Sequence, residues 1–185
     1  MMKRWIASLF AAAALPVYAQ SAVVKTDEVR AELVAHAPEG VSAGKPVWLG
    51  LVIEHAPHWH TYWKNPGDSG LPTTLTWQLP AGVIAGEIAW PTPKRLPVGP
   101  LVNYGFEDKL LLPVPALVAG DFKGESLNVK LSAQWLVCKD VCIPQQGEFV
   151  LVLGPGPVKE GDAAQAGHVL EVLLESLPAS EAARL

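Results

Sequence analysis

The only two cysteines of the 185-residue chain, Cys138 and Cys142, are separated by three residues and could form a redox-active disulfide. In a fully extended strand their Cα atoms would lie about 13 Å apart, whereas a disulfide requires a separation below about 7 Å. A turn at 139–141, or one turn of helix, would bring the two positions together. Strand-forming residues flank the pair, and Pro144 blocks helix propagation. We therefore predict a tight turn between two strands, with one cysteine on each side.

A disulfide at this spacing could serve either redox chemistry or stability. The loop-entropy model gives so small a ring only about 2 kcal/mol of stabilisation, compared with about 3 kcal/mol for a fifteen-residue loop. Exposed disulfides in short rings are often exchangeable, so we favour a redox pair over a disulfide that only pins a hairpin. Thioredoxin spaces its cysteines by two residues at a helix start, which lowers the pKa of the attacking thiol. Here Lys139 would favour a thiolate and Asp140 would oppose it, which suits exchange with thioredoxin-like partners better than self-activation.

The first 19 residues have the pattern of a secretory signal peptide. Lys3 and Arg4 precede an apolar run at 5–15, and cleavage is expected after Ala19, with Ala22 as the alternative. No later stretch reaches the roughly 18 apolar residues of a membrane helix. We therefore expect an exported mature chain without a membrane span, in an oxidising compartment where disulfides persist.

The charge balance and the missing motifs exclude several function classes. Loss of two positive charges with the signal peptide lowers the formal net charge from −4 to −6, which argues against nucleic acid as a partner. The sequence has no nucleophile elbow of a serine hydrolase, no haem-attachment signature and no phosphate-binding loop.

The composition predicts an all-β fold. Half of the residues are hydrophobic, and 16 glycines and 17 prolines separate short apolar runs, as in a β-sandwich or barrel of eight or nine strands. The four prolines at 91–100 predict a long loop, while Pro113 and Pro115 place their strand at a sheet edge. The strands are expected at 29–35, 46–54, 73–79, 83–90, 110–117, 127–137 and 148–153, and the first half of 55–72 could form a further short aromatic strand.

A Gly/Pro-rich segment at 154–157 marks the end of the domain, which we expect to span 23–153. The remainder, 154–185, is predicted to be a linker and a short helical tail. Its apolar residues fall on one helical face, and they are Ala166, Leu170, Leu173 and Leu177.

Three histidines, His55, His58 and His60, could hold zinc or copper together with the cysteines. Their spacing matches no tight template, because on a strand His58 and His60 share a face and His55 points the other way. We therefore interpret these histidines as polar side chains on a surface strand and expect neither a metal nor a cofactor.

Two long motifs, at 59–72 and 135–144, resemble the amino-terminal periplasmic domain of the thiol:disulfide interchange protein DsbD, in the branch that includes ScsB. The resemblance covers about 23–153. It implies an immunoglobulin-like β-sandwich that carries a cysteine pair on adjacent strands.

The resemblance also implies a function as a protein-disulfide reductase. The domain would take electrons from a membrane-embedded reductase domain and pass them to periplasmic thioredoxin-like oxidoreductases, among them disulfide isomerases and the thioredoxins of cytochrome c maturation. The alternative is a non-catalytic exported immunoglobulin-like binding module with a structural disulfide, which could bind copper or zinc through its histidines.

The resemblance places the catalytic role on Cys138 and Cys142 and favours Cys142 for the bond to the client. It implies a loop that caps the cysteines, here expected within 97–106. The cysteine spacing is shorter than in the best-known members of the family, and the cap residues of those members have no clear equivalents. The further residues expected near the site or in the cap are Tyr104, Phe106, His60, Tyr62, Lys139 and Asp140.

Overall fold

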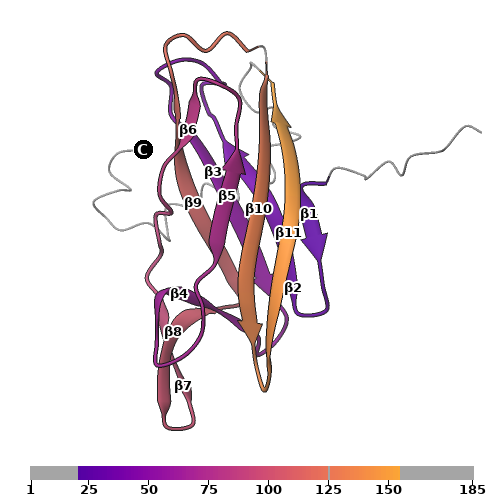
Figure 1. Ribbon diagram of the computed structural model, residues 1–185, viewed down its shortest axis with the longest axis vertical. Helices are drawn as coiled ribbons and strands as arrows, with labels where there is room; N and C mark the ends of the chain where they lie inside the picture. The colour runs from indigo at the N-terminus through magenta and orange to yellow at the C-terminus, as the bar shows by residue number, and fades with distance from the viewer. Residues whose placement is uncertain (1–20, 125, 155–185) are drawn as a thin grey trace, which may run out of the picture.

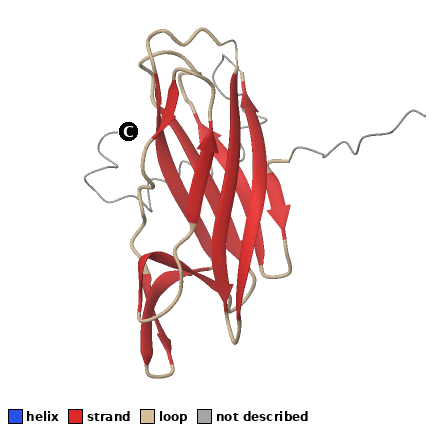
Figure 2. Ribbon diagram, viewed as in Figure 1, coloured by secondary structure: helices blue, strands red, loops and turns tan. Residues whose placement is uncertain are grey.

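The computed structural model describes residues 21–124 and 126–154, which form two β-sheets packed face to face (Figure 1). This part of the chain contains strands, turns and loops but no helix (Figure 2), and so no helix that could cross a membrane. The predicted signal peptide at 1–19 and nearly all of the predicted linker and helical tail lie outside the described residues.

Eleven strands make up this part of the chain, rather than the eight or nine expected. In chain order they are β1 (Val23–Lys25), β2 (Val29–His36), β3 (Val47–His55), β4 (His60–Gly67), β5 (Thr74–Gln78), β6 (Val83–Ala85), β7 (Lys94–Val98), β8 (Leu101–Glu107), β9 (Lys109–Val118), β10 (Leu127–Cys138) and β11 (Cys142–Leu153).

The strands pair antiparallel in both sheets. One sheet has the order β1-β2-β3-β9-β6, and the other has the order β11-β10-β4-β8-β7 with β5 paired to β10. Two antiparallel sheets packed over one core form an immunoglobulin-like sandwich, which confirms the predicted fold class.

The core lies between the sheets and follows from the alternation of apolar residues along the strands. On β3 and β10 every second side chain is buried against the opposite sheet. These side chains are Val47, Leu49, Leu51, Ile53, Leu127, Val129, Leu131, Ala133, Trp135 and Val137. On the outer face of β3, Val52 belongs to a smaller apolar cluster against which Trp48 packs.

The proline-rich segment at 91–100 is not a long loop, so that prediction is wrong. It contains β7, which pairs with β8 and forms an edge of the second sheet. Pro97 is tolerated there, because an edge strand needs backbone N–H groups on one side only. The strand expected at 83–90 is shorter than predicted and ends at Ala85.

Pro113 and Pro115 do not mark a sheet edge either, since β9 lies between β3 and β6. The carbonyls of these two prolines accept hydrogen bonds from Ala89 N at 2.9 Å and Gly86 N at 2.8 Å. A strand residue directs its N–H and its carbonyl to the same side, so the missing proline N–H groups face this irregular segment. The ladder between β9 and β3 is therefore intact.

The long hairpin of β10 and β11 has continuous pairing over twelve residue pairs, from Leu127↔Leu153 to Cys138↔Cys142. On its other side β10 pairs with β5 over Lys130–Gln134 and with β4 only at Cys138↔His60. The hairpin turn therefore lies beside β4 at one end of the sandwich (Figure 1).

Gln145 on β11 joins this hairpin to the first sheet. Its Oε1 accepts hydrogen bonds from Trp135 Nε1 at 2.9 Å and from Thr26 Oγ1 at 3.3 Å, and its Nε2 donates to Glu28 Oε2 at 2.7 Å. Thr26 and Glu28 lie in the connection between β1 and β2. The amide thus fixes the position of the hairpin relative to the opposite sheet.

Replacing Leu112 with Ala should lower the free energy of unfolding by about 2–5 kcal/mol, because the truncation leaves a cavity in the core. Leu112 is fully buried on β9, and Leu117 on the same strand is 63% exposed, so Leu117→Ala is the matched control. Urea denaturation of both variants tests this; equal losses would contradict the packing described here.

Replacing Gln145 with Ala should cost about 1–2 kcal/mol of stability, because the partly buried Trp135 indole N–H and the Glu28 carboxylate both lose their partner. The neighbouring exposed Gln146 supplies the control variant Gln146→Ala, which should be close to neutral. Urea unfolding followed by tryptophan fluorescence measures both; a neutral Gln145→Ala would show that the network does not hold the hairpin.

Candidate functional site

The two cysteines form a disulfide across the end of the β10–β11 hairpin, with their Cα atoms 4.1 Å apart. The three residues between them form the turn, in which Lys139 N donates a hydrogen bond to Val141 O at 3.0 Å. The predicted turn with a cysteine at each side is therefore present. Lys139 and Asp140 are both exposed in this turn and face solvent.

The two cysteines differ in their access to solvent. Cys138 ends the central strand β10 and is only 2% exposed, because β4 covers it through the pair Cys138↔His60. Cys142 begins the edge strand β11 and is exposed, like Val141 beside it. Of the two cysteines, Cys142 is therefore the one exposed at the surface of the domain.

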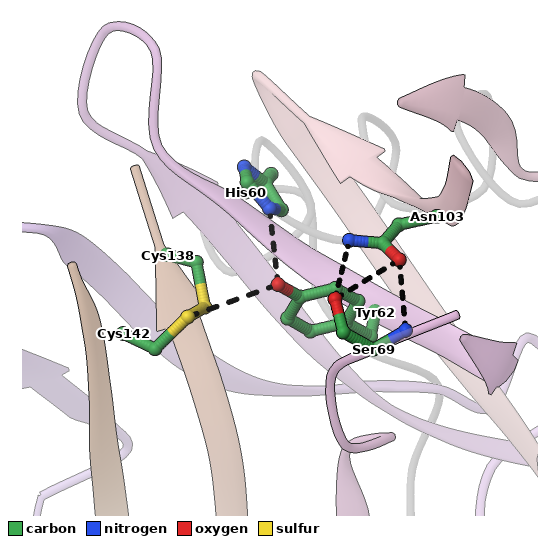
Figure 3. Close-up of a disulfide and its surroundings, with 6 residues drawn as sticks. All are labelled: His60, Tyr62, Ser69, Asn103, Cys138 and Cys142. Carbon is green, nitrogen blue, oxygen red and sulfur yellow. Dashed lines mark hydrogen bonds between the residues drawn. A yellow bond between two sulfur atoms is a disulfide. The ribbon is translucent and has the colours of Figure 1, made fainter. Parts of the chain in front are cut away.

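His60 and Tyr62 on β4 lie beside the disulfide, as Figure 3 shows. Tyr62 Oη is 3.3 Å from His60 Nε2 and 3.9 Å from Cys142 Sγ, so the hydroxyl lies between the imidazole and the sulfur. The two rings meet edge to face with their centroids 5.2 Å apart. The structure thus brings together four of the residues named from the sequence, namely Cys138, Cys142, His60 and Tyr62.

Burial keeps both β4 side chains neutral at pH 7. It lowers the pKa of His60, an effect that the nearby carboxylate of Glu107 opposes, and it raises the pKa of Tyr62. A neutral imidazole and a neutral phenol can each donate or accept one hydrogen bond toward the other.

The loop that follows β4 holds the Tyr62 ring in place. Gly70 has a φ of 102°, and a Cβ atom at this position would come within 2.3 Å of the Tyr62 ring. The buried Asn103 fixes the neighbouring residue: its Oδ1 accepts from Ser69 N at 3.0 Å, and its Nδ2 donates to Ser69 Oγ at 3.0 Å. Asp68 Oδ2 accepts a hydrogen bond from Val102 N at 2.8 Å.

Sequence reasoning missed Ser69 and Asn103 as residues that shape the site. The turn chemistry at 65–68 is visible in the sequence, but Asn103 lies 34 positions beyond Ser69. Only the pairing of β4 with β8 brings these two residues together.

The two cap candidates on β8 occupy different environments. Tyr104 is 38% exposed and lies against the end of β4, where a Cβ atom at Gly67 would be 3.3 Å from its ring. Phe106 is buried in the core and stacks on Trp90 with ring centroids 6.4 Å apart. Among the described residues, no hydrogen bond or aromatic contact links either ring to the cysteines.

The three histidines lie in separate surroundings. His55 uses both ring nitrogens, with Nδ1 2.9 Å from Asp108 O and Nε2 3.0 Å from Thr61 Oγ1. His58 is exposed in the turn before β4, and His60 faces Tyr62. Within residues 21–124 and 126–154, no three side chains of His, Cys, Asp or Glu come together as metal ligands would.

A largely apolar groove of about 530 Å³ runs alongside the cysteine hairpin. The loop after β4 forms one wall, where Leu71 is 64% exposed, and the two hairpin strands form the other. The lining residues are Leu71, Pro72, Thr74, Gln134, Trp135, Leu136, Pro144, Gln145 and Gln146.

Comparison with known proteins identifies a family and solved structures with similarity to this chain. Residues 27–154 match the family described as the N-terminal part of the thiol:disulfide interchange protein DsbD. The structure is similar to the N-terminal periplasmic domain of ScsB from Proteus mirabilis, with a TM-score of 0.61 and 21% sequence identity over 85% of this chain. The GAE domain of yeast GGA1, at a TM-score of 0.37 and 10% identity over 70% of this chain and 96% of its own, is too dissimilar to support an argument.

The alignment covers 59% of the ScsB domain, so this chain spans less than two thirds of that structure, and at 21% identity the similarity shows the fold alone. No curated protein sequence matches the chain significantly. The family match, however, extends over well more than half of the chain and includes both cysteines and β4. This chain therefore belongs to the family of N-terminal domains of the thiol:disulfide interchange protein DsbD.

Proposed function

We propose that this domain is a periplasmic thiol–disulfide exchange module that relays two electrons through Cys138 and Cys142. The observation that carries the proposal is the unequal access to the two sulfurs at the hairpin turn, with Cys142 exposed and Cys138 buried. An exchange centre needs one sulfur that a partner can reach and a second that resolves the intermediate.

The domain is reduced in two exchange steps. A thiolate of the upstream partner attacks Cys142 Sγ, a new disulfide forms between partner and domain, and the electron pair of the broken bond leaves on Cys138 as a thiolate. A second partner thiol, ionised by loss of its proton to water, attacks the partner sulfur of the mixed disulfide and releases Cys142 as a thiolate.

The reduced domain then passes the electron pair to a client. The Cys142 thiolate attacks the client disulfide, and one client sulfur leaves as a thiolate. The Cys138 thiolate next attacks Cys142 Sγ, which restores the Cys138–Cys142 disulfide and releases the second client thiolate. The client gains two electrons, and its thiolates take protons from water.

Family membership supports the choice of partners. We propose a membrane-embedded DsbD-type reductase domain upstream, and periplasmic thioredoxin-like oxidoreductases or disulfide isomerases downstream, including those of cytochrome c biogenesis. The proposed organisation is a signal peptide at 1–19, the redox domain at 23–153, and a linker with a helical tail at 154–185. In this proposal, the segment that flanks a partner's cysteine binds in the apolar groove beside the hairpin.

The rival proposal is an inert disulfide in a binding module. The small size of the disulfide ring argues against this rival, because the loop-entropy model gives such a ring only about 2 kcal/mol of stabilisation. Eleven further residue pairs continue the β10–β11 ladder beyond the cysteine pair. The hairpin therefore does not need the bond to keep its register.

The reduction potential of the Cys138/Cys142 pair should lie between roughly −180 and −270 mV, the range of exchange-competent thiol proteins. Equilibration of the mature domain in glutathione buffers, followed by alkylation of free thiols and mass spectrometry, measures it. A pair that stays oxidised below about −300 mV would establish a structural disulfide and reject the relay.

Single cysteine variants should differ in their reaction with oxidised glutathione. Cys138→Ala leaves the exposed Cys142 and should form the mixed disulfide readily, whereas Cys142→Ala leaves the buried Cys138 and should react about tenfold more slowly, because access limits exchange. Mass spectrometry of quenched time points gives both rates.

Unfolding in guanidinium provides the control for this comparison. It exposes both thiols, so the two variants should then react at similar rates. Equal rates in the folded variants, or faster reaction of Cys138, would contradict the assignment of Cys142 as the sulfur that partners attack.

A further inference from the structure

The Tyr62 hydroxyl is the only described side-chain group with a hydrogen bond to either cysteine sulfur. The Tyr62 side chain is 2% exposed, its ring is enclosed by Gly70, and its hydroxyl points at Cys142 Sγ from 3.9 Å (Figure 3). A disulfide sulfur is a weak acceptor, so this contact is long in the oxidised domain. A thiolate is a strong acceptor, and charge-assisted hydrogen bonds are shorter and about twice as strong as neutral ones.

His60 is the second partner of this hydroxyl. Its Nε2 lies 3.3 Å from Tyr62 Oη, and the imidazole is neutral at pH 7 because burial lowers its pKa. With the proton on Nε2, His60 donates to Tyr62 Oη and leaves the O–H of Tyr62 free to donate to the sulfur. With the proton on Nδ1, Nε2 accepts from Tyr62, whose oxygen can then accept from a Cys142 S–H.

We propose that the Tyr62 hydroxyl donates a hydrogen bond to the Cys142 thiolate of the reduced domain, and that His60 acts as a positioning residue that orients this hydroxyl. The inference rests on the proposed exchange reaction and deepens it. The His60–Tyr62 pair can donate a hydrogen bond to the Cys142 thiolate or accept one from the Cys142 thiol. It stabilises the sulfur in the two steps in which Cys142 carries the negative charge. These are the release of Cys142 from the upstream mixed disulfide and the attack of Cys142 on the client disulfide.

Other charged groups surround this pair. Glu107, which pairs with His60 across β4 and β8, is held by Lys94 at 3.7 Å, and Lys94 also contacts Asp108 at 3.1 Å. His55 on β3 interacts electrostatically with His60. The turn itself carries the exposed Lys139 and Asp140, which bear opposite charges and for which no described hydrogen bond to either sulfur is present. The contact with Tyr62 therefore remains as the directed interaction at Cys142.

The loop on the other side of the ring prevents Tyr62 from turning away. Gly70 closes on the ring, and the Ser69–Asn103 hydrogen bonds fix the loop to β8. The hydroxyl is thus held beside the sulfur before a partner arrives, so that little reorganisation is needed when charge appears on the sulfur.

The test uses the Cys138→Ala domain, in which Cys142 is the only thiol and no redox partner is needed. The rate of alkylation by iodoacetamide is measured as a function of pH, because only the thiolate reacts. Adding Tyr62→Phe should raise the pH midpoint by about one unit and slow alkylation at pH 7 about tenfold. An unchanged midpoint in a folded Tyr62→Phe variant would overturn the inference.

His60 variants separate positioning from packing. His60→Gln retains an N–H donor and should keep most of the effect, whereas His60→Ala should raise the midpoint, although by less than Tyr62→Phe does. A purely structural role predicts lower melting temperatures for both variants with no change in the midpoint, and that result would remove His60 from the proposal. Tyr104→Phe, an exposed tyrosine on β8 without a contact to the sulfurs, is the control and should leave the midpoint unchanged.

One measurement remains informative if Tyr62→Phe does not fold. With Tyr62 intact, the midpoint in Cys138→Ala should lie below about 8.5, the ordinary value for a free cysteine; a midpoint at or above it would overturn the inference. Failure of the exchange function has a different signature, namely a wild-type pair that stays oxidised in glutathione buffers. The two proposals can therefore fail independently.

Discussion

The continuous antiparallel pairing of β10 with β11 is the constraint on which the site depends. Because the ladder has no bulge, the register is the same from Leu127↔Leu153 to Cys138↔Cys142, and it brings the two sulfurs within bonding distance at the turn. A shift of one residue would place every core side chain of β10 on the wrong face of its sheet. The hydrophobic core therefore fixes the geometry of the cysteine pair.

The order of strands explains why the two cysteines differ. β10 is a central strand. At Cys138, its last residue, β4 pairs with it on the side opposite β11, so Cys138 is buried beside His60. β11 is the edge strand, and Cys142 at its first residue has no neighbouring strand to cover it. Chemically equal residues four positions apart thus acquire different exposure from topology alone. In the proposed exchange reaction, this asymmetry leaves one sulfur for partners and one for resolution.

The sequence predicts the parts of the fold and site that depend on local pattern, and fails where tertiary context decides. Alternation identifies β3 and β10, and the strand formers around the cysteines identify their turn. Prolines mislead twice, because a proline is tolerated in a strand wherever its missing N–H faces no neighbouring strand. Pro97 lies on an edge strand, and Pro113 directs its carbonyl to an irregular segment. Phe106 was named as a cap candidate, yet it is buried in the core against Trp90, and Asn103 was not named at all, because both depend on the pairing of β8 with β4.

The fold depends little on the disulfide for its stability, and this independence suits the proposed relay. The register of the hairpin rests on eleven further residue pairs, on the core, and on the hydrogen bonds of Gln145 to Trp135 and Glu28. The small disulfide ring adds little to these interactions. In the loop-entropy model, reduction removes only about 2 kcal/mol of stabilisation, which is small compared with the remaining interactions. The Tyr62 hydroxyl is held by Gly70 and His60 rather than by the disulfide. The same framework can therefore present Cys142 to a partner both when the bond is closed and when it is open.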